Sequence, residues 1–461
     1  MKVGILPLAR ATFDVALAEE KLQLMLAALD RSSHQVLGPR SLLFDAETTT
    51  AAMEELKSEG IDHLMLLQVT FTDAALTVTA ANTFQEPFSI WAIKEPRAGG
   101  RLRLNSFCGL NLASHALALR DREFSWLYDD PSDGIEAELD ALFNGKRRAG
   151  HLQAIASEPY ASGQGQSIAK NIASRRIAKI GGHPDGFDTC AYSPAELSNL
   201  SGVTVDALEL DDLFNTAAAA STDETKAARD MAQASMSNLD DMDQDQLDKS
   251  LRLKTGLDQL RSDGRYDAFA IRCWPETFTE YGGAVCGPAG MMGEAGVPCA
   301  CEADVYGALT QLVLQEASGE AVFLTDLVDI DPEDNSAVVW HCGQAPISMR
   351  DPEVDASATI HTNRKMPLLY EFPLKPGAVT FVRISQSFNQ PKMILAAGEM
   401  LKRPMAFTGT SGVVRFENPA DEVLSNVMDS GLEHHMALAY GEHRPALRAA
   451  AAAMKLPILE I

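Results

Sequence analysis

Apolar and polar positions form alternating blocks over the first hundred residues. Continuous apolar runs of the kind found in buried parallel strands occur in KVGILPL and HLMLLQV. Between them, FDVALAEEKLQLMLAALD and TTTAAMEELKSEG have helical periodicity, and Gly60 closes the second segment. This alternation predicts a parallel sheet with helices on its faces. No glycine fingerprint for a dinucleotide follows the first strand, so we do not expect NAD binding.

Two further domains are predicted from the rest of the pattern. Strand-like runs in RIAKIGG, VTVDALEL, DAFAIRCW and CACEAD, with helical patterns over about residues 217–261, indicate a second α/β domain. Later runs, among them AVFLTDLVDI and SAVVWHCG, are separated by turns and indicate a mostly antiparallel β-rich domain. The expected fold class is α/β, with Rossmann-like α/β domains at residues 1–98 and 99–320 and a β-rich C-terminal domain at 321–461. We place SGLEHHMALAYGEH in a helix that closes the third domain.

Composition restricts the possible partners and the compartment. The 461 residues have a formal net charge of −25, which argues against nucleic acid and against an anionic membrane surface, since both require a basic face. No apolar stretch is long enough to span a bilayer, and the N-terminus does not resemble a signal peptide. Seven cysteines show neither a disulfide framework nor zinc spacing, which fits a reducing compartment. We therefore expect a cytoplasmic protein.

Acidic and imidazole side chains interrupt the apolar runs. Glu302 follows VPCAC, Asp326 lies inside AVFLTDLVDI, and His341 follows the run SAVVW. A buried carboxylate is unfavourable unless it is paired, hydrogen-bonded or bound to a metal. Together with His435, these side chains offer carboxylate oxygens and imidazole nitrogens, a set that suits Mn²⁺ or another divalent cation with open positions for substrate oxygens.

Each of these side chains also has an alternative interpretation. Glu302 could lie at the start of the next helix, and Asp326 could cap a turn or pair with an arginine. His341 could be a hydrogen-bonded core histidine, and His434 and His435 could lie on a solvated helix face. Spacing along the chain leaves open whether the four candidate ligands meet.

The segments around these residues resemble the L-fucose isomerase and L-arabinose isomerase superfamily of metal-dependent aldose–ketose isomerases. CACEADVYGALTQL and AVFLTDLVDI are similar to the family segments that carry the glutamate and aspartate ligands. The C-terminal segment from VMDSGLEHH onward is similar to the one with the histidine ligand. The resemblance implies Glu302, Asp326 and His435 as metal ligands, with His341 near an additional histidine of the arabinose type. The chain is most similar to the compact, fucose isomerase-like branch.

This resemblance implies transfer of a proton between C1 and C2 of an open-chain sugar. Glu302 and Asp326 would act as base and acid through an enediol, and the metal would bind O1 and O2. Glu433 and Glu442 are the expected partners for the second nitrogen of His435. The expected enzyme is a Mn²⁺-dependent homotrimer or homohexamer that acts on a small-molecule sugar.

Substrate contacts are predicted from residue type. Trp274 in IRCWPE is a candidate platform for a sugar, with a core tryptophan as the alternative. His434 would face substrate hydroxyls or solvent. A sulfonated or carboxylated sugar would need a local basic group, for which Arg10, Arg272 and Arg415 are available.

Two other classes of function fit the same residues. One is a metal-dependent hydrolase or lyase that acts on a sugar derivative, and the other is a non-catalytic sugar-binding protein. Exchange of a substrate proton with solvent deuterium at C1 or C2 would distinguish an enediol isomerase from a hydrolase or lyase. A binding protein would keep its ligand affinity after Glu302→Gln and Asp326→Asn.

Overall fold

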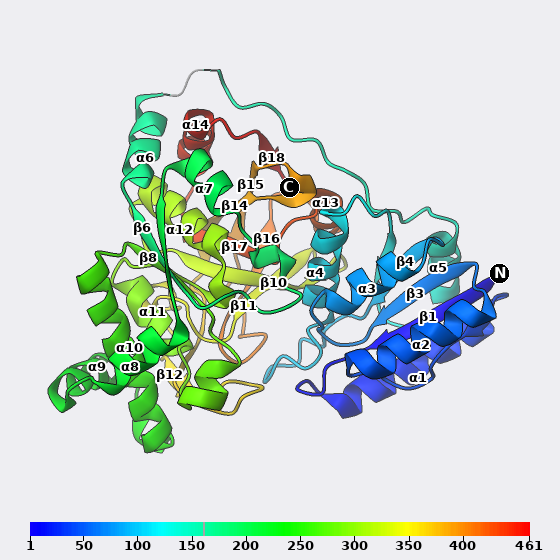
Figure 1. Ribbon diagram of the computed structural model, residues 1–461, viewed down its shortest axis with the longest axis horizontal. Helices are drawn as coiled ribbons and strands as arrows, with labels where there is room; N and C mark the ends of the chain where they lie inside the picture. The colour runs from blue at the N-terminus through cyan, green and yellow to red at the C-terminus, as the bar shows by residue number, and fades with distance from the viewer. Residues whose placement is uncertain (160–161) are drawn as a thin grey trace.

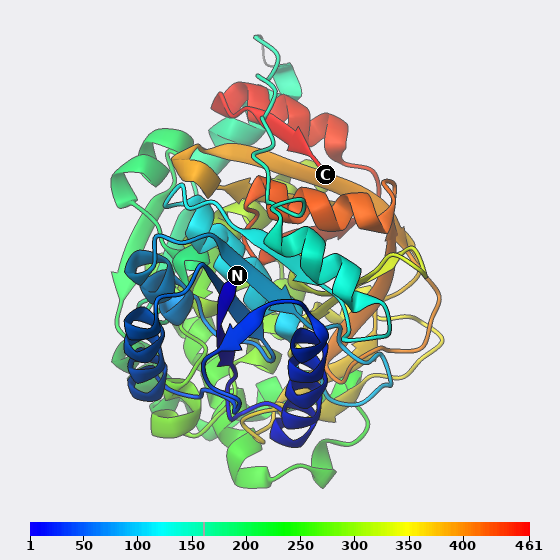
Figure 2. The same cartoon turned by 90° about the vertical axis from the view of Figure 1, so that its right-hand side faces the viewer.

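A computed structural model of the chain describes residues 1–159 and 162–461. Its N-terminal part is a five-stranded parallel sheet in the order β2-β1-β3-β4-β5, covered by helices on both faces (Figures 1 and 2). The strands are β1 Lys2–Leu8, β2 Gln35–Leu37, β3 His63–Gln68, β4 Phe88–Ala92 and β5 Ser125–Tyr128. The helices are α1 Val15–Arg31, α2 Ala46–Glu59, α3 Ala75–Thr83, α4 Ser106–Ala118 and α5 Ile135–Phe143. The sheet extends beyond residue 98, where the sequence predicted the first boundary, because β5 pairs with β4.

Local sequence explains the ends of the first helices. Asp14 accepts a hydrogen bond from the backbone N–H of Leu17 at the start of α1, and Asp45 does the same for Thr48 at the start of α2. Gly60 ends α2 with a φ of 68°, a left-handed conformation that glycine adopts without a steric penalty. The predicted closure of this helix at Gly60 is confirmed.

The second part is a four-stranded parallel sheet in the order β7-β6-β8-β9. Its strands are β6 Arg176–Ile180, β7 Thr204–Leu208, β8 Ala268–Ile271 and β9 Cys299–Ala300. The helices of this part are α6 Gly163–Ala173, α7 Pro194–Ser201, α8 Leu210–Ala218, α9 Thr222–Ser235, α10 Gln244–Gly264, α11 Cys286–Glu294 and α12 Val305–Ser318. Throughout the described part of the chain, no helix combines the length and the apolar character that crossing a membrane requires.

The third part is a nine-stranded, mostly antiparallel sheet in the order β12-β13-β16-β11-β10-β17-β14-β15-β18. The strands are β10 Phe323–Asp331, β11 Ser336–His341, β12 Ser357–Thr359, β13 Leu369–Pro373, β14 Gly377–Ser385, β15 Lys392–Met400, β16 Thr410–Phe416, β17 His435–Tyr440 and β18 Ile458–Glu460. A further pairing between β15 and β16 closes the strands from β16 to β15 into a ring. Helix α13 Ala420–Ser430 packs against β10 and β16, and helix α14 Arg444–Met454 packs against β15. The predicted α/β class with a β-rich C-terminal part is confirmed.

One element of the prediction is wrong. SGLEHHMALAYGEH does not form a closing helix, because His435 begins β17, which lies between β10 and β14 in the large sheet. The run HMALAY is short and apolar, and such a run is compatible with either a buried strand or a buried helix. Pairing with two neighbouring strands determines the outcome here.

The large sheet lies between the two parallel sheets (Figure 1). Helix α4 is buried along its whole length and packs against β10, and α12 packs against β14 and β17. Three polar side chains of α4 bond to carbonyl groups at the end of α13 and just beyond it. Asn111 Nδ2 donates to the Leu432 oxygen at 2.6 Å, and His115 Nδ1 donates to the Gly431 oxygen at 2.8 Å. The first part of the chain thereby supports the loop that leads into β17.

We expect Asn111→Ala to destabilise the protein by about 1–3 kcal/mol, because it leaves the buried carbonyl of Leu432 without its donor. Thermal unfolding followed by circular dichroism measures the effect as a lower midpoint. The control is Asn144→Ala, which removes a hydrogen bond from the exposed end of α5. Equal midpoints for the two variants would contradict the proposed support of the loop by α4.

Candidate active site

The first side chains of the site follow two neighbouring parallel strands. Trp274 follows β8 and Glu302 follows β9, at the carboxyl edge of the second sheet. Ligands of α/β proteins bind at this edge, where the strands end and the loops that follow them form a crevice. Glu302 has a φ of 60°, a left-handed conformation that is unfavourable for a non-glycine residue and points to a local constraint at this position.

The remaining candidate ligands come from the large sheet. Asp326 lies in β10 directly opposite His435 of β17 on one side and opposite Trp340 of β11 on the other. Opposed residues of antiparallel strands project from the same face, so the carboxylate and the imidazole point to the same side. His341 ends β11, and one ligand atom each of Asp326, His341 and His435 lie within 4.8 Å of one another.

A single cavity connects these side chains with the N-terminal part of the chain. Glu302, Asp326, His341 and His434 line it from the second sheet and the large sheet. Its other walls come from the first part and from loops of the other two, and they include Arg10, Phe71, Trp274, His361 and Arg364. All predicted substrate contacts except Arg272 and Arg415 therefore lie at this cavity.

Glu302 is held by hydrogen bonds to both carboxylate oxygens. Trp274 Nε1 donates to Oε1 at 3.0 Å, and His434 Nε2 lies 2.9 Å from Oε2. Burial by itself would raise the pKa of Glu302, but the contacts with His434, His435 and Trp274 lower it to about 2. The carboxylate is therefore ionised at neutral pH. His434 is buried and bonds to Glu302, which excludes the solvent-facing alternative for this residue.

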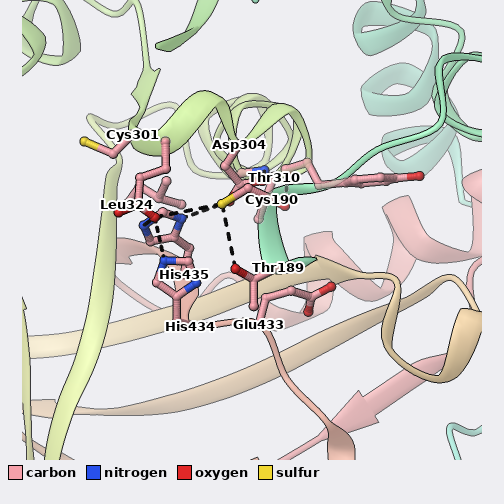
Figure 3. Close-up of polar contacts among 12 residues, drawn as sticks. Thr189, Cys190, Cys301, Asp304, Thr310, Leu324, Glu433, His434 and His435 are labelled. Carbon is pink, nitrogen blue, oxygen red and sulfur yellow. Dashed lines mark hydrogen bonds and ion pairs between the residues drawn. The ribbon is translucent and has the colours of Figure 1, made fainter. Parts of the chain in front are cut away.

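His435 is oriented by a second carboxylate. Its Nδ1 lies 3.0 Å from Asp304 Oδ2 (Figure 3). Its Nε2 lies 3.4 Å from Asp326 Oδ1 and 3.9 Å from Glu302 Oε2. Since a carboxylate only accepts, Nδ1 carries the hydrogen and Nε2 presents its lone pair to the two acidic side chains. A carboxylate that orients a histidine in this way is characteristic of metal ligands.

Asp304 is itself fixed by a buried ion pair. Arg383 donates to its two oxygens at 2.6 and 3.1 Å, and both side chains are 1% exposed. Burial opposes ionisation of Asp304, but the charge of Arg383 and the bond to His435 outweigh it and lower the pKa of the carboxyl. The prediction that Glu433 or Glu442 would bind the second nitrogen of His435 is wrong. Glu433 accepts from the Gln386 backbone instead, and Glu442 pairs with Arg444.

Asp326 has an unused oxygen. Its side chain is buried, and Oδ1 has no hydrogen-bond partner among the described residues. Burial and the nearby charge of Glu302 raise the pKa of Asp326 to about 7, against the opposing effect of His435. A buried oxygen without a partner is unfavourable unless a ligand or ion completes its contacts.

His341 differs from His435 in its hydrogen-bonding state. Its Nδ1 accepts from the backbone N–H of Cys342 at 2.9 Å, so Nε2 carries the hydrogen in the neutral ring. Burial lowers the pKa of His341 to about 3, which keeps the ring neutral. Nε2 is buried and lacks a partner in the described structure. In this tautomer His341 can donate to a substrate oxygen but has no lone pair on Nε2 for a metal.

Several residues were placed incorrectly or missed by the sequence analysis. Arg272 pairs with Glu276 at 2.7 Å, and Arg415 is exposed on β16, so neither lines the cavity. Arg383 was missed although it interrupts the apolar run GAVTFVRIS, the same signal that identified Asp326. Arg364 lies in the polar stretch HTNRKM, where no pattern distinguishes it from a surface residue.

Comparisons with known proteins agree with this arrangement. Residues 4–145 match the model of the fucose/sulfoquinovose isomerase N-terminal domain, and residues 339–461 match that of the L-fucose isomerase C-terminal domain. A sulfoquinovose isomerase of Priestia aryabhattai is 30% identical over 95% of this chain and 94% of that protein. A sulfoquinovose isomerase of Alkalicoccus urumqiensis is 28% identical over 100% of this chain and 99% of that protein.

We expect Arg383→Met to destabilise the protein by about 3–5 kcal/mol, because it leaves the charge of Asp304 buried without its partner. Thermal unfolding measures this as a lower midpoint. The matched control is Arg415→Met, which removes an exposed arginine from the same sheet. If the two variants unfold at the same temperature, the buried ion pair does not have the structural role assigned to it.

Proposed function

The chain belongs to the fucose/sulfoquinovose isomerase family and is an aldose–ketose isomerase, and we propose that its substrate is sulfoquinovose. The relatives that carry this name align with nearly the whole chain. The observation that carries the proposal is that Glu302 and Asp326 line one cavity with arginine side chains, while His435 Nε2 lies 3.9 and 3.4 Å from their carboxylate oxygens. The alternatives of a hydrolase, a lyase or a binding protein have no comparable support.

In the proposed reaction, two carboxylates handle the proton that moves between C1 and C2. Glu302 is fixed by Trp274 and His434, so its oxygens keep a defined direction toward the cavity. Asp326 lines the cavity and its side chain makes no hydrogen bond in the described structure, so one of its two oxygens is available to accept or return a proton. His341 Nε2–H would hold a substrate oxygen. Carboxylates fixed in this way act as general acid and base without reorganisation during the reaction.

The donor set also fits a divalent cation, and we propose Mn²⁺. Nε2 of His435 has a free lone pair and lies 3.4 Å from Asp326 Oδ1 and 3.9 Å from Glu302 Oε2. Either carboxylate oxygen lies close enough to His435 Nε2 for the two to bind one ion, given metal–ligand bonds of about 2.0–2.2 Å. The cation would act as a Lewis acid toward the substrate oxygens at C1 and C2. Cys190 lies 3.9 Å from Glu302 but its thiol pKa is raised by burial, so the neutral thiol is a poor ligand.

A cytoplasmic location and a homotrimer or homohexamer stay predictions. The cavity is lined by residues of one chain that come from all three sheet regions.

We expect Glu302→Gln and Asp326→Asn each to lower kcat on sulfoquinovose by about 10²–10⁴-fold, because each removes a carboxylate that takes part in proton transfer. The wild-type enzyme should also incorporate solvent deuterium at C1 or C2, which NMR detects. Glu316→Gln, in α12 and outside the cavity, is the matched control. Full turnover in either active-site variant would refute the assigned roles, and a wild type inactive on sulfoquinovose would refute the substrate.

A second prediction concerns the orientation of His435. We expect Asp304→Asn to weaken Mn²⁺ binding by about 10–100-fold, because the neutral amide no longer stabilises the imidazole in its ligating tautomer. Calorimetric titration of chelator-treated protein with Mn²⁺ measures the affinity.

The matched control for this titration is Glu433→Gln. Glu433 lies 3.8 Å from the same Arg383 guanidinium but is not a hydrogen-bond partner of His435. The Glu433→Gln variant should therefore retain the wild-type affinity for Mn²⁺. If both variants lose the same Mn²⁺ affinity, the effect comes from a disturbed Arg383 rather than from the orientation of His435.

A further inference from the structure

Two arginines lie close to the tryptophan of the cavity. The guanidinium carbon of Arg10 lies 5.6 Å from the centre of the Trp274 ring, and that of Arg364 lies 5.9 Å from it. Arg10 follows β1 in the first part of the chain, whereas Arg364 lies in the loop before β13. Both line the same cavity as Glu302 and Asp326. Two cations from distant parts of the chain therefore meet at one wall.

These cations are not equally compensated. Arg10 pairs with Asp73 at 2.5 Å, which neutralises one of the two charges. In the part of the chain that the structure describes, the Arg364 guanidinium has neither a carboxylate partner nor a hydrogen-bond acceptor. Burial and the repulsion of Arg10 both lower the pKa of Arg364, as expected for two cations near the same indole ring. A positive charge without a partner is unusual in a chain with a net charge of −25, and it indicates that a ligand anion belongs here.

The tryptophan contacts both the carboxylate side and the arginine side of the cavity. Its Nε1 donates to Glu302 Oε1 at 3.0 Å, while Arg10 and Arg364 lie near its ring. A sugar bound along the indole would have C1 and C2 at the carboxylates and its far end at the arginines. This arrangement suits a sugar that has its charged group away from the reacting carbonyl.

We propose that Arg364, together with Arg10, binds the sulfonate at C6 of the substrate and that Arg364 determines the preference for sulfonated over neutral sugars. This inference rests on the proposed function and identifies the residue that makes it selective. A guanidinium group suits the task because its planar N–H donors can bond two sulfonate oxygens at once. Arg10 already donates one N–H to Asp73 and remains in place, which leaves Arg364 as the group whose charge the substrate satisfies.

The test compares two sugars that differ only in the sulfonate. The substrates are sulfoquinovose and quinovose, which has hydrogen in its place, and the enzymes are wild type, Arg364→Gln, Arg364→Lys and the control Arg415→Gln. We expect Arg364→Gln to reduce the ratio of kcat/KM for sulfoquinovose to that for quinovose by about 100-fold, mainly through KM. Arg364→Lys should lose less of this ratio, since lysine keeps the positive charge but lacks the planar pair of N–H donors. Arg415→Gln should keep the wild-type ratio because this arginine is exposed on β16.

The outcomes separate this inference from the proposed function. If wild type turns over sulfoquinovose and Arg364→Gln keeps the wild-type ratio, the role of Arg364 is refuted and the function stands. If wild type turns over only quinovose, both proposals are refuted. Calorimetry of sulfoquinovose with the inactive Glu302→Gln enzyme, with and without Arg364→Gln, measures the contact without turnover. Unchanged affinity in the double variant would also refute the contact, and a loss of affinity would support it.

Discussion

The buried carboxylate of Asp304 is the interaction on which the site depends. It accepts the backbone N–H of Gly307 at the start of α12, pairs with Arg383 of β14 and binds Nδ1 of His435 in β17. One side chain thereby connects a helix of the second part to two strands of the large sheet. The charge of Asp304 is stable in the interior because Arg383 compensates it, and this charge holds His435 in the tautomer that leaves Nε2 free. Without this ion pair the histidine would have no fixed direction.

A second constraint is the position of the large sheet between the two parallel sheets. The carboxyl edge of the second sheet supplies Trp274 and Glu302, and β10 and β17 supply Asp326 and His435. The first part contributes Arg10 and, through α4, supports the loop that leads into β17. Each part alone would leave polar side chains without partners. The cavity therefore exists only in the folded whole, and its polar groups are arranged around space that a ligand can fill.

The electrostatics of the cavity separate two tasks. At one end, Glu302 and Asp326 lie near the neutral His341 and near His435, which Asp304 orients. This set suits proton transfer and cation binding. At the other end, two arginines lie near the indole and only Arg10 is paired with a carboxylate, which suits an anion. Trp274 contacts both ends, by a hydrogen bond to Glu302 and by its ring face to the arginines. This polarity gives a substrate a single productive direction, although the chain as a whole is strongly acidic.

The sequence by itself determined the α/β class, the β-rich C-terminal part and the positions at which polar groups enter apolar runs. Glu302 and Asp326 were recognisable because a carboxylate in such a run requires a partner. Only the tertiary structure decided that Asp326 lies opposite His435, since strand register depends on pairing between segments more than a hundred residues apart. It also decided that HMALAY is a strand, that Asp304 rather than Glu433 orients His435, and that Arg364 faces the cavity. A short apolar run fits either conformation, and a polar loop contains no periodicity, so these features depend on contacts that local sequence does not encode.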